Sequence, residues 1–191
     1  QLEDINISDE FGITGSKRDL KTKEALKNIL LPFLSYSKKV TIIDPYFYLH
    51  FSYCQRTLRI VAECLRERRG HREKGSIGIH CKWDKDIKDI RGKIKVWQQA
   101  IKNISRAFNH SIKLHAWERI DRTAIKLHDR YIITNQSGLV SAAGIGLDEW
   151  QQSEWSIKDY GELNHVLMQY KENSSPFKLK CIITTSSIEE Q

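Results

Sequence analysis

The chain has 191 residues, a length typical of one domain that can bury its own core without disulfide or metal staples. Hydrophobic residues make up 40% and charged residues 29%, which excludes disordered, collagen-like and disulfide-scaffold proteins, and no apolar run approaches the ~20 residues of a transmembrane helix. The net charge of +7 favours an anionic partner such as nucleic acid, acidic lipid headgroups or a phosphorylated small molecule, with a merely basic surface as the alternative.

Residues 1–17 are polar and irregular, and they predict a linker or N-terminal arm. Apolar residues then recur at helical spacing from Lys17 to about Ser37, where Pro32 predicts a kink or a helix end. The β-branched run Val40–Phe47 predicts a buried strand with Asp44 near its C-terminal end.

Further along the chain, the clearest helix has one apolar stripe from Ile87 to Phe108. The remaining expected elements are a helix over 58–70, strands over 76–83, 112–117, 125–134 and 139–144, a helix over 160–170 and a strand over 179–184. Strand–helix–strand units imply parallel pairing, and the short turns between later strands imply antiparallel pairing. We therefore predict an α/β domain over 18–191, with a mixed β-sheet sandwiched between helices.

The four cysteines form no C-x-x-C pair, and three of them lie in apolar segments. We expect buried, reduced thiols in a cytoplasmic protein, with no metal and no cofactor. The chain opens on Gln1 instead of Met, which we interpret as a domain from a longer parent protein in preference to processing.

The predicted strand over 125–134 carries the chemistry. Side chains alternate along a strand, so Lys126, His128 and Arg130 share one face. Two cations beside an imidazole can clamp a phosphate, and the imidazole is a competent nucleophile near neutral pH. Ordinary solvated charges on an edge strand are the alternative, and alternation by itself favours that alternative.

The segment Leu127–Asn135, with Ala142-Ala143-Gly144 after it, resembles the phospholipase D superfamily, whose signature is H-x-K-x4-D followed by a turn with Gly, Ser and Asn. The resemblance covers roughly residues 20–185, as one half of that fold. It implies that the histidine attacks phosphorus, that the lysine and asparagine hold the phosphate, and that a second histidine protonates the leaving group. No metal is required.

Carried over residue by residue, His128 matches the nucleophile, and Arg130 replaces the family's lysine. Asn135 replaces its aspartate, and we expect Asn135 and Lys126 to bind phosphate. Glu154 is the best match to a glutamate at the start of the next strand, and we expect it to orient His128. The turn lacks the family's serine and asparagine, so the catalytic set is partly eroded.

A second resemblance explains that erosion. His128-Asp129-Arg130, with Gly144–Asp148 downstream and Asp44-Pro45-Tyr46 upstream, is similar to the phospholipase-D-like C-terminal domain of MIT-domain proteins. That domain is regarded as non-catalytic and as a binder of acidic lipids and protein partners, although Glu154 is not a feature that we associate with it. Similar His-Asp-Arg domains also resemble parts of bacterial antiviral effectors.

Basic residues crowd the predicted helix near its start, where Lys88, Arg91 and Lys95 are candidate contacts to a phosphate backbone. A solvated helix face is about equally favoured. Trp117 is a candidate for stacking on a base, whereas Trp97 lies on the apolar stripe and is expected in the core.

The leading hypothesis is a metal-independent phosphodiesterase, a nuclease with His128 as nucleophile, in which a homodimer supplies the second histidine. The alternative, nearly as strong, is a degenerate module that binds nucleic acid, acidic phospholipid or a protein partner. The missing serine and asparagine of the turn discriminate between them: if no other side chain replaces them, binding is favoured.

Overall fold

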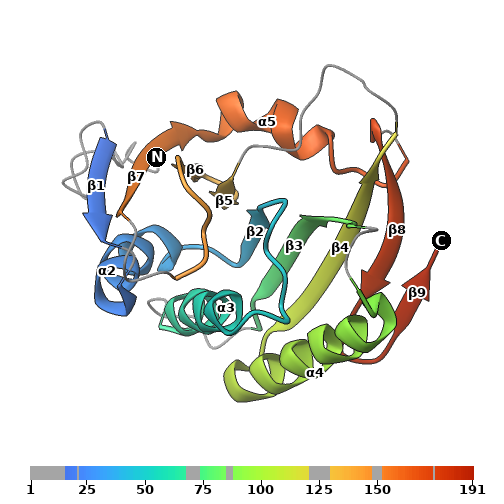
Figure 1. Ribbon diagram of the computed structural model, residues 1–191. Coiled ribbons are helices and arrows are strands. Elements are labelled where there is room, and N and C mark those ends of the chain that lie inside the picture. The colour runs from blue at the N-terminus through green and yellow to red at the C-terminus, as the bar shows by residue number, and fades with distance from the viewer. Residues whose placement is uncertain are drawn as a thin grey trace.

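The computed structural model describes residues 16–20, for which only the backbone is considered, and residues 22–67, 74–84, 88–120, 130–147, 152–173 and 175–191 (Figure 1). The strands are β1 (Ser16–Leu20), β2 (Lys39–Ile43), β3 (Ser76–Lys82), β4 (Ser111–Arg119), β5 (Tyr131–Ile133), β6 (Ser137–Ser141), β7 (Gln152–Asp159), β8 (Phe177–Ile183) and β9 (Ile188–Glu190). The helices are α2 (Lys23–Leu34), α3 (Ser52–Arg66), α4 (Ile90–Phe108) and α5 (Tyr160–Met168).

Within these ranges the strands form one mixed sheet in the order β1-β7-β6-β5-β2-β3-β4-β8-β9. Strands β2, β3 and β4 are parallel neighbours, joined through α3 and α4. The other neighbouring strands pair antiparallel. Helices α2, α3 and α4 cover one face and α5 lies on the other (Figure 1), which confirms the predicted α/β class and the sheet between helices.

The two faces of the sheet are covered unequally because the strand residues alternate in character. In β3, Ile77, Ile79 and Cys81 are buried in the main core beneath α3 and α4. Gly78 and His80 point to the opposite face, where α5 buries only a small cluster around Ile43 and Leu163. The predicted core position of Trp97 is confirmed, and all four cysteines are free and buried.

The expected helix over Lys17–Ser37 is wrong in its first part. Residues Ser16–Leu20 form β1, which pairs with β7, and the helix begins only after Thr22. The Thr22 hydroxyl caps it by accepting a hydrogen bond from the Ala25 N–H at 3.1 Å. Strands β1 and β9 are not among the predicted elements, and β7 is expected only through the resemblance, at Glu154. The expected arm lies largely outside the described residues.

None of the described helices is both long and apolar enough to cross a bilayer.

Two histidines are hydrogen-bonded to tryptophans inside the fold. Trp97 Nε1 donates to His50 Nδ1, and Trp117 Nε1 donates to His80 Nδ1, both at 3.0 Å. The ring of His115 stacks on that of His80 with centroids 4.7 Å apart. Burial is the main cause that lowers the pKa of His50, His80 and His115 below 6.5.

The free energy of unfolding should therefore fall as the pH drops below about 6.5. At such a pH the histidines of the unfolded chain bind protons that the folded chain excludes. The full free energy of unfolding is therefore present above the unfolded pKa of about 6.5, and it falls as the pH drops toward the lower pKa values of the folded chain. Each buried imidazole contributes a slope of at most about 1.4 kcal/mol per pH unit. Urea unfolding at a series of pH values measures the slope.

His80→Gln provides the sharp variant, because the glutamine oxygen can still accept from Trp117 while the titrating ring is removed. The free energy of unfolding of His80→Gln should change less steeply with pH than that of the wild type. His165 is exposed on α5, so His165→Gln should leave the slope unchanged. Equal slopes in the wild type and His80→Gln would contradict the assignment.

Candidate functional site

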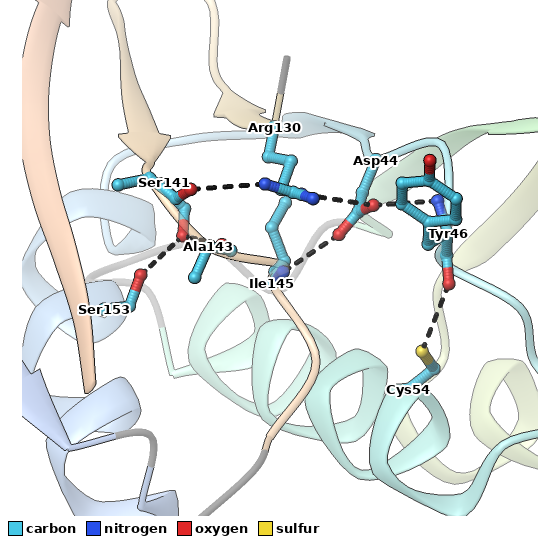
Figure 2. A network of polar contacts seen from close by, with 9 residues as sticks. Asp44, Tyr46, Cys54, Arg130, Ser141, Ala143, Ile145 and Ser153 are labelled. Atoms are coloured by element: carbon cyan, nitrogen blue, oxygen red, sulfur yellow. Dashed lines mark hydrogen bonds and ion pairs between the residues drawn. The ribbon is translucent and has the colours of Figure 1, made fainter. Parts of the chain in front are cut away.

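Asp44 directly follows β2 and is only 2% exposed. The next residue, Pro45, has no N–H to continue a strand ladder, and Asp44 Oδ1 instead accepts from the Tyr46 N–H at 2.9 Å. Asp44 Oδ2 accepts from the Ile145 N–H, also at 2.9 Å (Figure 2). One buried carboxylate thus fastens the end of β2 to the loop after β6.

Arg130 precedes β5 and points at this carboxylate (Figure 2). Its Nε lies 3.9 Å from Asp44 Oδ1, and its Nη1 donates to the Ala142 carbonyl at 3.2 Å. The guanidinium carbon is 5.9 Å from the centre of the Tyr46 ring. The side chain is 23% exposed, so Arg130 lies half inside the protein and is held by the protein's own groups.

The loop after β6 is fixed from two sides. Ser141 Oγ contacts Ser153 Oγ at 2.8 Å on β7 and donates to the Ala143 carbonyl. On the other side, Thr57 Oγ1 of α3 accepts from the Leu147 N–H at 2.9 Å. These hydroxyl groups hold the backbone of the loop in place. The sequence did not indicate that Ser141 and Ser153 belong to this site.

Exposed aromatic side chains surround this loop and the end of β2. Tyr46, Phe51 and Tyr53, which we call the aromatic rim, are 45%, 39% and 36% exposed. The rings of Phe51 and Tyr53 stack with centroids 5.2 Å apart. A side chain at Gly146 would meet the Tyr53 ring at 2.4 Å, so only glycine permits this ring to lie on the loop.

One cation of α4, Lys93, lies near the rim. The Trp97–His50 hydrogen bond joins α4 to the segment between Tyr46 and Phe51, and the charge of Lys93 helps burial to lower the pKa of His50. Three predicted nucleic-acid contacts, Lys88, Arg91 and Lys95, are exposed on α4 and the turn before it.

The predicted catalytic set is only partly within the described residues. His128 and Lys126 lie outside them. The Glu154 carbonyl accepts from the Ala142 N–H at 3.1 Å, which places the backbone of Glu154 beside this loop. Along β7, the exposed side chain of Glu154 alternates with the buried side chain of Ser153, so the two point to opposite faces of the sheet. Arg130 lies on the face of Ile132, which is the face of the main core. The Glu154 side chain therefore points away from Arg130.

Asn135 lies in the turn between β5 and β6, at the end of β5 opposite to Arg130, so it cannot hold one phosphate together with Arg130. Asn135 instead lines a cavity on the face of the sheet that carries α5. The predicted stacking role of Trp117 is wrong. Trp117 is completely buried with its N–H bound to His80, which leaves no face of the indole for a base.

Comparison with known proteins adds little to this geometry. No family model matches the sequence, and no curated protein matches it. The fold is similar to that of an archaeal chromatin protein, TrmBL2, whose structure is described as showing a novel mode of DNA binding. That similarity has a TM-score of 0.44 at 11% sequence identity, and it covers 89% of this chain and 55% of the other. The chain thus spans about half the length of that neighbour.

Across the described ranges, no group of three or more His, Cys, Asp or Glu side chains is arranged to hold a metal ion.

Removing the Asp44 carboxylate should destabilise the fold strongly. Asp44→Ala frees the N–H groups of Tyr46 and Ile145 and leaves the part-buried Arg130 without its anion. We expect the free energy of unfolding to fall by about 3 kcal/mol, measured by urea denaturation. Asp159→Ala is the matched control, because Asp159 is exposed and its side chain does not cap α5. The control should change the value by less than about 0.5 kcal/mol, and equal losses would contradict the anchoring role.

Proposed function

We propose that this domain is a phospholipase-D-like module that binds single-stranded nucleic acid without cleaving it. The observation that carries the proposal is the position of Arg130. In the resemblance, this residue replaces the lysine that holds the phosphate. Here its Nη1 donates to the Ala142 carbonyl, and its Nε lies 3.9 Å from the Asp44 carboxylate without a hydrogen bond of its own to the described residues. An internal carboxylate therefore already lies within ion-pair distance of this cation.

A phosphodiester at that position would place a second negative charge beside a carboxylate that is 2% exposed. A phosphodiester and a carboxylate that both contact Arg130 would repel each other strongly where water is excluded. Asp44 is also bound to two backbone N–H groups, so it cannot turn away without breaking them. This electrostatic cost favours binding at the surface over phosphoryl transfer in the interior.

The aromatic rim offers the surface for such binding. Every base has a flat face, and stacking of a base on an aromatic side chain contributes about 1–3 kcal/mol in single-strand binding proteins. Lys93 of α4 lies near the rim, and the exposed cations at the start of the same helix suit a phosphate backbone that leaves the stacked bases. A duplex hides its base faces, so the rim favours single strands.

Titration of labelled single strands and duplexes at several salt concentrations tests this proposal. The wild type should bind single strands more tightly than duplexes of the same length. Replacing Lys88, Arg91 and Lys95 by glutamine should lower affinity for all sequences and flatten the slope of log affinity against log salt by about 2, because each lost contact removes about 0.7 counterions. The matched control replaces three exposed lysines on other elements, Lys23, Lys158 and Lys178, and should leave the slope nearly unchanged.

Replacing Phe51 by alanine separates stacking from charge. Affinity for single strands should fall by about tenfold or more with an unchanged salt slope, because a stacking contact releases no counterion. Absence of binding at low salt would reject the nucleic-acid proposal and return the module to acidic phospholipid or a protein partner.

Incubation with oligonucleotides in EDTA tests the absence of cleavage. We expect no product from the wild type or from His128→Ala. Chelator-resistant cleavage that disappears in His128→Ala would overturn the non-catalytic proposal in favour of the phosphodiesterase.

A further inference from the structure

A cavity of about 820 Å³ lies on the face of the sheet that carries α5. Its floor is the outer surface of β2, β3 and β4, where Thr41, Gly78 and His80 point away from the main core. Its walls come from α5 and the segment Tyr170–Glu172. The cavity is thus on the face opposite to the main core and is separate from the aromatic rim.

Two hydrogen-bonding groups on this floor are set up for a ligand. Thr41 is 8% exposed, and its hydroxyl makes no hydrogen bond to the described residues. His80 Nδ1 accepts from Trp117, so the neutral ring carries its proton on Nε2. Burial lowers the pKa of His80 well below its ordinary value, which keeps the ring neutral and its tautomer fixed.

Gly78 lies between these two groups and keeps the floor open. A Cβ atom built on Gly78 would lie 3.8 Å from Thr41 Oγ1 and 3.9 Å from His80 Nε2. Those distances are ordinary contacts, so the backbone does not require glycine here. The missing side chain instead leaves room for a ligand atom next to both donors.

The cavity is positively charged. Four lysines line it, Lys39, Lys74, Lys113 and Lys171, against one described acidic residue, Glu172. Glu172 is already occupied, because its Oε1 lies 3.2 Å from Lys113 Nζ and 3.5 Å from His115 Nε2. Leu167, Met168 and Tyr170 form an apolar and aromatic wall on the other side.

We propose that this cavity binds a small organic phosphate of nucleotide size. The lysines and the donors of Thr41 and His80 would receive the phosphate, and the wall around Tyr170 would receive a planar ring. The volume falls within the ~300–1,000 Å³ typical of small-molecule sites. Basic, polar and apolar surfaces in one cavity match a ligand that has an anionic end and an aromatic end.

Isothermal titration calorimetry with the four nucleoside 5′-monophosphates tests the site, with adenosine as the probe that lacks phosphate. We expect saturable binding of at least one monophosphate and at least about tenfold weaker binding of adenosine. Failure of all four to bind at about 1 mM, which corresponds to about −4 kcal/mol, would overturn the proposal. Binding of adenosine as tight as that of its monophosphate would overturn the phosphate assignment.

Gly78→Val places a β-branched side chain, which strands favour, in the space between the donors. It should weaken monophosphate binding by about tenfold or more, while Lys23→Gln, at an exposed position on α2 away from the cavity, should leave it unchanged. Thr41→Val is the second variant, because it removes the hydroxyl and keeps the shape, and it should weaken binding several-fold. Unchanged affinity in either folded variant would overturn the site. Both variants should still bind oligonucleotides at the aromatic rim, so failure of this proposal is distinguishable from failure of the nucleic-acid proposal.

Discussion

The carboxylate of Asp44 is the contact on which the end of β2 and the loop after β6 depend. It follows β2, the strand that pairs in parallel with β3 on one side and antiparallel with β5 on the other. Its two oxygens bind the backbone at Tyr46 and Ile145, and Arg130 lies beside it. A charge that is 2% exposed needs such partners, because an isolated ion in the interior is far more costly than a paired one.

The same contact determines what the edge can bind. Because Asp44 holds the loop and Arg130 faces Asp44, the cation is already balanced inside the protein. Among the described residues, the exposed aromatic rim and the first cations of α4 form the proposed binding surface. In the proposed binding mode, a strand across that surface would keep its phosphates in water, where salt screens the Asp44 charge.

The cavity proposed as a phosphate site exists because the two faces of the sheet are covered unequally. Three helices bury the apolar side, whereas α5 covers only part of the other side. The uncovered part of β2, β3 and β4 is polar, with Thr41, His80 and His115 facing outward next to a glycine. Such residues would be costly beneath a helix, but on the floor of an open cavity they are available to a ligand.

The sequence by itself determined the α/β class, the mixed sheet, the buried strand that leads to Asp44 and the helix whose stripe contains Trp97. Periodicity and β-branched runs report local burial, and burial is what forms these elements. Only the tertiary structure decided that Trp117 is buried, that Glu154 faces away from Arg130, and that Asn135 lies at the other end of β5. These outcomes depend on which distant strands pair and in which register, and a one-residue difference in register moves a side chain to the other face.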